Sequence, residues 1–183
     1  MTREMKWKTL SSKYVYHDRW FKARAASCEL PDGRIIEPYY VVELPNWANV
    51  VVVTKDERMV FVRQYRYAGD MITIELPGGV IDKNESPEAA VKREMIEETG
   101  YTSNEIEFLY QVSPNPAIND NTAYFYLARN AERGGTQKFD PFEDIEVVSF
   151  SKEEVIQLLR EGKFQHGVQV GAIYDALVKL KWL

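Results

Sequence analysis

Short apolar and alternating runs divide the start of the chain into strand-like segments. They cover residues 13–16, 20–30 and 35–44, and the turn-forming run Pro31-Asp32-Gly33-Arg34 separates the second from the third. Leu44-Pro45-Asn46 then reads as a boundary. The pattern predicts a small N-terminal antiparallel β subdomain over residues 1–46. A sheet of this size needs a further surface to pack on.

Longer apolar strands and helical patterns follow from Trp47 onward. The expected strands are residues 49–54, 59–66, 71–76, 106–112, 122–129 and 145–150. Helices are expected over residues 87–99, from Ser151 to near Gly162, and over residues 167–182. This mixture predicts an α+β fold for residues 47–183, an α/β/α sandwich in which a mixed β-sheet lies between helices.

Composition and charge narrow the classes of function. The chain has 183 residues, 45% of them hydrophobic, which is enough for a substantial globular core. A net charge of -5, with Lys and Arg scattered along the chain, argues against long nucleic acid as a partner. No apolar run reaches the length of a membrane span. Because Cys28 is the single cysteine, no intrachain disulfide can form, and a cytoplasmic location is expected.

Three carboxylates are predicted to share one face of the first helix. Ser86-Pro87-Glu88 has the residues preferred at a helix start, and Gly100 suits a left-handed stop. Glu94, Glu97 and Glu98 stand at positions i, i+3 and i+4, so their like charges repel one another. Acidic helix faces are most often simply solvated. Two neighbouring features favour a site for Mg2+ or Mn2+ instead, since these ions prefer oxygen ligands.

The first of these features is Arg93, which is placed to orient Glu85 or Glu97. The second is the run Leu76-Pro77-Gly78-Gly79, a turn that brings bare backbone close to whatever the carboxylates hold. Magnesium held by a few carboxylates completes its shell with water and phosphate oxygens, so the expected substrate is a phosphoanhydride. The metal would neutralise charge as the bond breaks and activate a water molecule.

The residues from Gly79 to Tyr101 resemble the signature of the Nudix hydrolases. Their spacing is G-x5-E-x7-R-E-U-x-E-E-x-G-U, where U is a bulky apolar residue, and it is met by Gly79, Glu85, Arg93, Glu94, Glu97, Glu98 and Gly100. The resemblance implies a Nudix fold with Glu94, Glu98 and the Gly78 carbonyl as the main metal ligands. It implies Glu97 as a further or alternate metal ligand and as a catalytic residue. Gly79, Glu85 and Arg93 are implied as structural support.

Stretches outside this signature resemble one Nudix subgroup, the ADP-ribose pyrophosphatases and related nucleoside diphosphate sugar hydrolases. They include Arg19-Trp20-Phe21, Val62-Arg63-Gln64-Tyr65-Arg66 and Ile74-Glu75-Leu76-Pro77. The resemblance implies hydrolysis to a nucleoside monophosphate and a sugar phosphate. It also implies a homodimer in which the N-terminal subdomain is exchanged, so that the partner helps to build each site.

Substrate-binding residues follow from the same resemblance. Arg66 is implied as a clamp on the diphosphate, its alternative being an edge-strand charge paired with Asp70. Glu75 is implied near the second half of the substrate or the dimer contact. Trp20 is implied as a stacking partner of the base, with Tyr40 as a weaker candidate. Pro116 marks a loop beside the terminal sugar.

A late acidic loop is implied to supply the catalytic base. Glu143 matches the catalytic carboxylate of the subgroup, with Asp144 and Glu146 as alternatives. The chain departs from many ADP-ribose hydrolases at Ser113-Pro114-Asn115, where they have Ser-Pro-Gly, so ADP-ribose as sole substrate is in doubt. Two alternatives stay open: a dinucleoside polyphosphate or capped-RNA hydrolase of the same fold, and a nucleotide-sugar sensor that binds without turnover.

Overall fold

The computed structural model describes residues 3–19 and 21–183, which form two compact units. The first unit comprises residues 1–45 and 113–122, and the second comprises residues 46–112 and 123–183. The chain therefore leaves the second unit between strands β9 (Glu105–Val112) and β10 (Ala123–Arg133) and returns to it. The hydrophobic pattern gave no sign that residues 113–122 pack with the N-terminal sheet.

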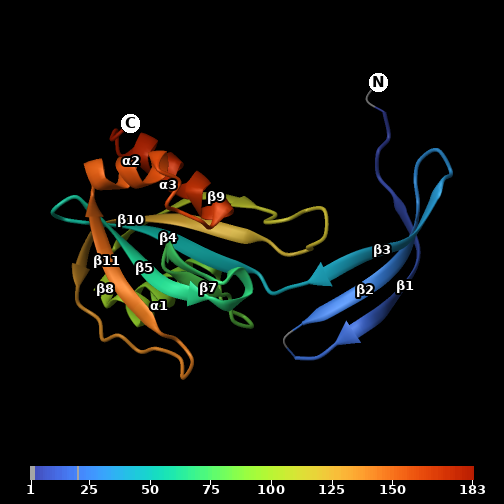
Figure 1. Ribbon diagram of the computed structural model, residues 1–183, viewed down its shortest axis with the longest axis horizontal. Helices are drawn as coiled ribbons and strands as arrows, with labels where there is room; N and C mark the ends of the chain where they lie inside the picture. Colours follow the sequence, from blue (N-terminus) through green and yellow to red (C-terminus); the bar gives the residue numbers. More distant parts are fainter. Residues whose placement is uncertain (1–2, 20) are drawn as a thin grey trace. The chain divides into compact units, whose positions relative to one another are not determined.

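The first unit is a three-stranded antiparallel sheet in the order β1-β2-β3 (Figure 1). Its strands are β1 (Lys8–His17), β2 (Lys22–Glu29) and β3 (Ile35–Glu43). The predicted turn closes with Leu30 N–H donating to Arg34 O at 2.8 Å, and Gly33 adopts φ 85. Residues 113–122 attach to β3, because Val42 N–H donates to Ile118 O at 2.8 Å and Tyr39 Oη to Ala117 O at 2.7 Å.

The second unit contains an eight-stranded mixed sheet whose main path is β11-β5-β4-β10-β8. Strands β6, β7 and β9 attach to β5, β4 and β10 respectively, and the β4–β10 pairing is parallel while the other pairings are antiparallel. The remaining strands are β4 (Trp47–Thr54), β5 (Arg58–Arg66), β6 (Met71–Glu75), β7 (Gly78–Val80), β8 (Tyr101–Thr102) and β11 (Ile145–Ser151), with a 3-10 turn η1 at Tyr67–Gly69.

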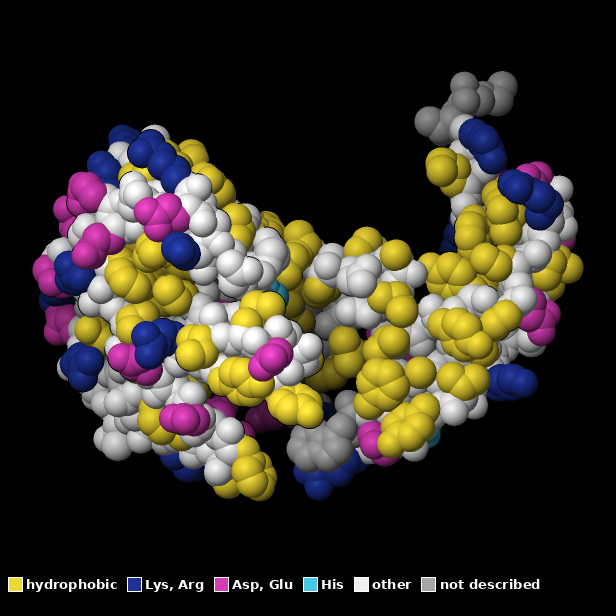
Figure 2. Space-filling view, in the orientation of Figure 1, with side chains coloured by type: hydrophobic (Ala, Val, Ile, Leu, Met, Phe, Trp, Pro, Cys, Tyr) yellow, Lys and Arg dark blue, Asp and Glu magenta, His cyan; other side chains and the backbone are white. Residues whose placement is uncertain are grey.

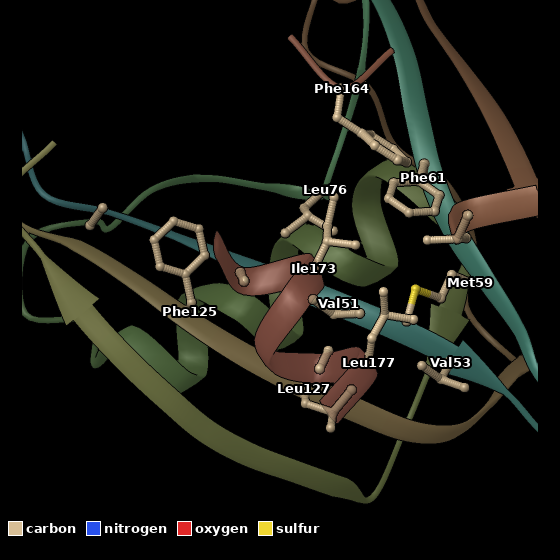
Figure 3. Packing of buried hydrophobic residues seen from close by; sticks show 14 residues of the cluster. Val51, Val53, Met59, Phe61, Leu76, Phe125, Leu127, Phe164, Ile173 and Leu177 are labelled. Atoms are coloured by element: carbon tan, nitrogen blue, oxygen red, sulfur yellow. The ribbon is translucent and has the colours of Figure 1, made fainter. Parts of the chain in front are cut away.

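Alternation along β4 explains why helices cover both faces of this sheet. Val51 and Val53 point into one core, which α2 (Lys152–Arg160) and α3 (Gly167–Lys179) cover with Val155, Ile173 and Leu177 (Figure 3). Ala48, Val50 and Val52 point into a second core, where α1 (Pro87–Thr99) contributes Val91 and Met95. The predicted α/β/α sandwich is confirmed.

The helix ends follow their local sequence closely. Ser86 caps α1 by accepting a hydrogen bond from Ala89 N at 3.2 Å, and Gly100 ends it with φ 71. Ser151 and Glu154 form a capping box at the start of α2. The last helix ends at Lys179 rather than at Trp182, since Lys181 adopts φ 58 and breaks the helical path. None of the helices in the described part of the chain is long and apolar enough to cross a bilayer.

Candidate active site

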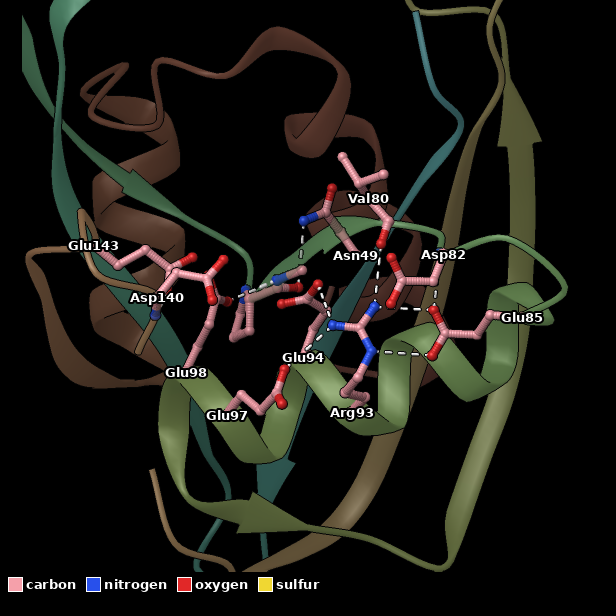
Figure 4. A network of polar contacts seen from close by, with 12 residues as sticks. Asn49, Val80, Asp82, Glu85, Arg93, Glu94, Glu97, Glu98, Asp140 and Glu143 are labelled. Carbon is pink, nitrogen blue, oxygen red and sulfur yellow. Dashed lines mark hydrogen bonds and ion pairs between the residues drawn. The ribbon is translucent and has the colours of Figure 1, made fainter. Parts of the chain in front are cut away.

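Arg93 links the carboxylates of α1 to the end of β7 and to the loop that contains Glu85. Its Nη1 donates to Glu94 Oε1 at 2.7 Å and to Glu97 Oε2 at 3.2 Å. Its Nε and Nη2 donate to the two carboxylate oxygens of Glu85 at 3.0 and 2.9 Å, and Nη2 also donates to Val80 O at 3.1 Å (Figure 4). One guanidinium therefore ties the end of β7 and the following loop to the acidic face of α1.

Glu98 is the most deeply buried of the helix carboxylates. Its side chain is almost fully enclosed, and Oε2 accepts a hydrogen bond from Gly78 N–H at 2.8 Å. Burial raises the pKa of Glu98 to about 8, and the nearby Glu94 adds to this, while the Gly78 hydrogen bond opposes it. Burial also raises the pKa of Glu94, against the lowering effect of Arg93. Two carboxylates are thus held where their charge is costly without a cation.

The backbone beside these carboxylates has no room for a side chain. Gly78 adopts φ 152, and a Cβ there would lie 2.2 Å from Ala48 O. A Cβ on Gly79 would lie 2.4 Å from Glu94 Oε1. Strand β7 pairs with β4, with Gly78 opposite Asn49, so the turn is pressed between the sheet and α1. Glycine is required at position 78 because β4 fills the space of a side chain, and at position 79 a side chain would displace the Glu94 carboxylate.

The possible metal ligands in this region are carboxylate and carbonyl oxygens, which are the atoms that a hard divalent cation prefers. Among the described residues, however, no group of three or more His, Cys, Asp or Glu side chains converges closely enough to hold a metal ion. The contacts explain this, because Arg93 engages Glu94 and Glu97 while the Gly78 amide engages Glu98. By the chemistry of their oxygen atoms, the residues fit a hard divalent cation.

A cavity of about 1160 Å³ in the second unit contains most of the predicted site residues. It is lined on one side by the α1 carboxylates and by Gly78, Gly79 and Arg93. Elsewhere it is lined by Arg66 and Glu75 on β5 and β6, by the acidic loop with Glu143, and by the start of α3. Glu85 does not line it and acts on it through Arg93. Sequence reasoning missed Asn49, Thr73, His166 and Gln169, which also line it.

Arg66 makes a bidentate ion pair with Glu75 across β5 and β6. Its Nε and Nη2 donate to Glu75 Oε1 and Oε2 at 2.8 and 2.7 Å, and Thr73 Oγ1 donates to Glu75 Oε1 at 2.6 Å. Glu75 is 2% exposed, while the Arg66 side chain is 51% exposed. Burial acts to raise the pKa of Glu75, but the Arg66 and Thr73 hydrogen bonds outweigh it and the net shift is downward. Arg66 pairs with Glu75 and not with Asp70, so that alternative is wrong; Asp70 instead accepts a hydrogen bond from Tyr65 Oη at 2.8 Å.

The three candidate bases are placed differently. Glu143 and Asp144 line the cavity, and Glu143 Oε2 accepts a hydrogen bond from Asp140 N–H at 2.8 Å within its own loop. Glu146 does not line the cavity, since it pairs with Arg63 at 2.9 Å across the β11–β5 ladder. Phe142, between the loop's acidic residues, is fully exposed.

The remaining predicted substrate residues lie outside the second unit. Trp20 lies outside the described residues. Tyr40 is an exposed residue of β3, where it borders a separate cavity of about 470 Å³ confined to the first unit. Pro116 belongs to the segment that packs with β3.

Known proteins resemble the chain over almost its whole length. A "Methanol dehydrogenase activator" of Bacillus methanolicus is 26% identical, covering 91% of this chain and 90% of its own. An "ADP-ribose pyrophosphatase" of Bacillus subtilis is 24% identical (93% and 95% covered), and a "GDP-mannose pyrophosphatase" of Salmonella arizonae is 28% identical (88% and 91% covered). A crystal structure titled "ADP compounds hydrolase" has the same fold, with a TM-score of 0.87, 21% identity, and coverage of 98% of this chain and 97% of that one.

Two family models match consecutive parts of the chain. Residues 7–42 match the nucleoside diphosphate sugar hydrolase N-terminal domain, and residues 45–168 match the NUDIX domain. The second match spans the sheet, the Gly78 turn, α1 and the acidic loop, which are the parts that form the cavity. Since it also covers more than half of the chain, this protein belongs to the Nudix family of divalent-metal-dependent hydrolases.

Proposed function

We propose that the protein hydrolyses the pyrophosphate bond of ADP-ribose or another nucleoside diphosphate sugar, releasing a nucleoside monophosphate and a sugar phosphate. The observation that carries this is the single cavity in which buried acidic groups of α1 lie together with the half-exposed guanidinium of Arg66. Such a cavity suits a ligand that carries both a cation and a diphosphate. Two of the relatives are named as an ADP-ribose pyrophosphatase and a GDP-mannose pyrophosphatase, which supports this substrate class.

The cation is proposed to be Mg2+ or Mn2+, held by the Gly78 carbonyl, Glu94 and Glu98, with Glu97 as a further ligand. When bound, it would supply charge neutralisation for the diphosphate and lower the pKa of a bound water. Arg66 is proposed to clamp the diphosphate with its exposed guanidinium edge, and Glu75 orients it by holding the other edge. Arg93 and Glu85 keep the acidic face of α1 in place, and Gly79 gives Glu94 room.

Glu143 is proposed as the base that accepts a proton from the attacking water, because it lines the cavity and Glu146 does not. Replacing Glu143 by Gln should lower kcat by about 10^2 to 10^4, the usual contribution of a positioned base. KM for the nucleotide sugar should change little, because the lost group acts in the chemical step. Glu146→Gln is the matched control, since its carboxylate pairs with Arg63 on the sheet. If Asp144→Asn lowers kcat to this extent while Glu143→Gln does not, the base is Asp144.

A substrate panel with product identification tests the reaction itself. Purified protein with Mg2+ or Mn2+ should release a nucleoside monophosphate and a sugar phosphate from at least one of ADP-ribose, ADP-glucose, GDP-mannose and UDP-glucose. Labelled water (18O) then shows which phosphorus is attacked. Turnover only of dinucleoside polyphosphates or capped RNA would establish the nearest alternative. Binding without turnover would establish the sensor, although every charged position of the family signature is present in this chain.

A homodimer that exchanges the N-terminal subdomain is proposed to complete the site with Trp20, Tyr40 and the Pro116 loop. Its support is the exposure of the three-stranded sheet, since β1 is exposed along its whole length. Apolar side chains lie on the surface of the described part of this unit (Figure 2), among them Trp7, Leu10, Tyr14, Val15, Tyr16, Ile35 and Tyr40. Light scattering of the purified protein should give twice the chain mass of 21.2 kDa, and a monomer mass would refute the exchange. The expected cytoplasmic location stays a prediction.

A further inference from the structure

Two buried amide side chains meet at the turn between β6 and β7. Asn49, on β4, is 4% exposed, and Gln169, in the first turns of α3, is 3% exposed. Both occupy positions that the hydrophobic pattern would fill with an apolar residue, since Val51 and Ile173 on the same elements belong to the core. A buried amide is costly unless it is hydrogen-bonded, so its partners indicate why it is there.

All of the partners lie in the turn Leu76-Pro77-Gly78. Asn49 Nδ2 donates to Leu76 O at 3.1 Å and to Pro77 O at 3.3 Å. Gln169 Oε1 accepts from Leu76 N–H at 2.8 Å. Val50 N–H also donates to Pro77 O at 3.0 Å, and Gly78 N–H donates to Glu98 Oε2 at 2.8 Å. The peptide groups on both sides of Pro77 are therefore held from β4, α1 and α3 at once. Figure 4 shows Asn49 of β4 and Glu98 of α1.

The orientation of the Asn49 amide shows that this side chain stabilises the turn and not its own strand. Two carbonyl oxygens require the nitrogen of Asn49 on the side of the turn, because an amide oxygen there would face two acceptors. Asn49 Oδ1 is then buried without a hydrogen-bond partner among the described residues. An apolar side chain in β4 would avoid that unpaired oxygen. The two hydrogen bonds to the turn offset the cost of burying this amide.

We infer that Asn49 and Gln169 are positioning residues for the cation site. They hold the Leu76–Gly78 turn from the side opposite α1, so that the Gly78 carbonyl and the Glu98 carboxylate keep a fixed spacing. Through Gln169, the start of α3 takes part in setting the affinity for the cation, although neither side chain touches it. The inference rests on the proposed function, in which Gly78 and Glu98 are metal ligands. Outer groups that orient ligands commonly change metal affinity by about 10- to 100-fold when removed.

The test is the Mn2+ affinity of the metal-free protein, measured by electron paramagnetic resonance, in Asn49→Leu and Gln169→Leu. Each variant should weaken Mn2+ binding about tenfold or more. Their activity on the preferred nucleotide sugar should return toward the parent value at saturating metal, a recovery that a general loss of folding would not give. Gln169→Glu keeps an oxygen acceptor for Leu76 N–H and should retain more affinity than Gln169→Leu. Urea unfolding of each variant checks that the chain is folded.

Asn121→Leu is the matched control. Asn121 is also a buried asparagine whose Nδ2 donates to a proline carbonyl, Pro45 O, at 3.0 Å, and whose Oδ1 has no partner among the described residues, but it lies in the first unit. Its Mn2+ affinity should equal that of the parent. Parent-like affinity in folded Asn49→Leu and Gln169→Leu would overturn the inference, and so would equal losses in Gln169→Glu and Gln169→Leu. If the parent itself neither binds Mn2+ nor hydrolyses nucleotide sugars, the proposed function fails instead.

Discussion

Replacing Glu98 by Gln should lower kcat by about 10^3 or more while leaving the fold intact. A metal ligand contributes several kcal/mol of transition-state stabilisation, and each 1.36 kcal/mol corresponds to about a tenfold change in rate. Glutamine keeps the shape of the side chain and can still accept the hydrogen bond from Gly78 N–H, so only the charge is lost. Steady-state kinetics with Mg2+ or Mn2+ measure this loss, and added metal should not restore the rate.

The same variant should change how the stability of the metal-free protein depends on pH. The pKa of Glu98 is about 8 in the folded chain against an ordinary value of 4.5. Between these values the folded state holds a proton that the unfolded state has released, so stability is full below pH 4.5 and falls as the pH rises to 8. Glu98→Gln removes that fall. A divalent cation should restore stability to the parent at high pH, because it stabilises the ionised carboxylates.

The titration of His166 changes stability with pH in the direction opposite to that of Glu98, so the two effects must be measured separately. Burial lowers its pKa below 6.5, so its contribution to stability is lost as the pH falls below that value. Urea unfolding between pH 6.5 and 8 with a chelator avoids the titration of His166. The pKa of Glu94 is also raised, so the contribution of Glu98 is the difference between the parent and Glu98→Gln over this range. Glu88→Gln is the control, since Glu88 is an exposed residue of the same helix paired with Lys92 at 2.6 Å. Full metal-dependent turnover in Glu98→Gln would remove Glu98 from the ligand set.

Replacing Arg66 by Ala should reduce both stability and substrate binding. It leaves the buried carboxylate of Glu75 without its bidentate partner, which costs about 3 kcal/mol, the lower end of the range for broken buried pairs because Arg66 is half exposed. It also removes the proposed diphosphate clamp, and KM should rise about tenfold or more. Arg66→Lys keeps a charge but loses the planar fork, so KM should stay raised.

A double variant separates these two effects. Glu75→Gln in the Arg66→Ala background removes the unpaired charge and still allows a hydrogen bond with Thr73, so urea unfolding should show most of the lost stability restored. KM should remain high, since the guanidinium is still absent. If KM recovered together with stability, Arg66 would be a structural residue only, and the clamp would have to be sought elsewhere in the cavity.

The parts of the site that local sequence predicted are those whose geometry a helix imposes by itself. Glu94, Glu97 and Glu98 share a face because of helical periodicity, and Ser86 and Gly100 end α1 through their own backbone preferences. The longer strands from Trp47 onward followed from apolar runs, which indicated a sheet covered on both faces. The short strands β7 and β8 were not predicted. Family resemblance added roles for Arg66 and Glu143 that spacing alone could not supply.

Contacts between segments that are distant in sequence could not be predicted from helical periodicity or from apolar runs. Arg66 lies opposite Met71 in the β5–β6 ladder, and it reaches Glu75 diagonally along the paired strands. Asp70 was the nearer acid in sequence. The sequence offered one weak signal for Asn49 and Gln169, an amide within an apolar pattern, but no indication of a shared partner. The attachment of residues 113–122 to β3 likewise depends on backbone hydrogen bonds that leave no compositional trace.

The sequence by itself determined the class of chemistry: an acidic helix face after a glycine turn, suited to a cation and a phosphoanhydride. Tertiary structure alone decided which of those carboxylates is buried, because burial depends on packing against β4 and the Gly78 turn, and burial is what raises the pKa of Glu98. It also decided which acidic loop residues reach the cavity, since strand register engages Glu146 with Arg63 on the sheet. The spacing of charged residues along a helix is a local property that follows directly from the sequence. Burial and strand register depend on contacts between distant segments, so they exist only in the folded chain.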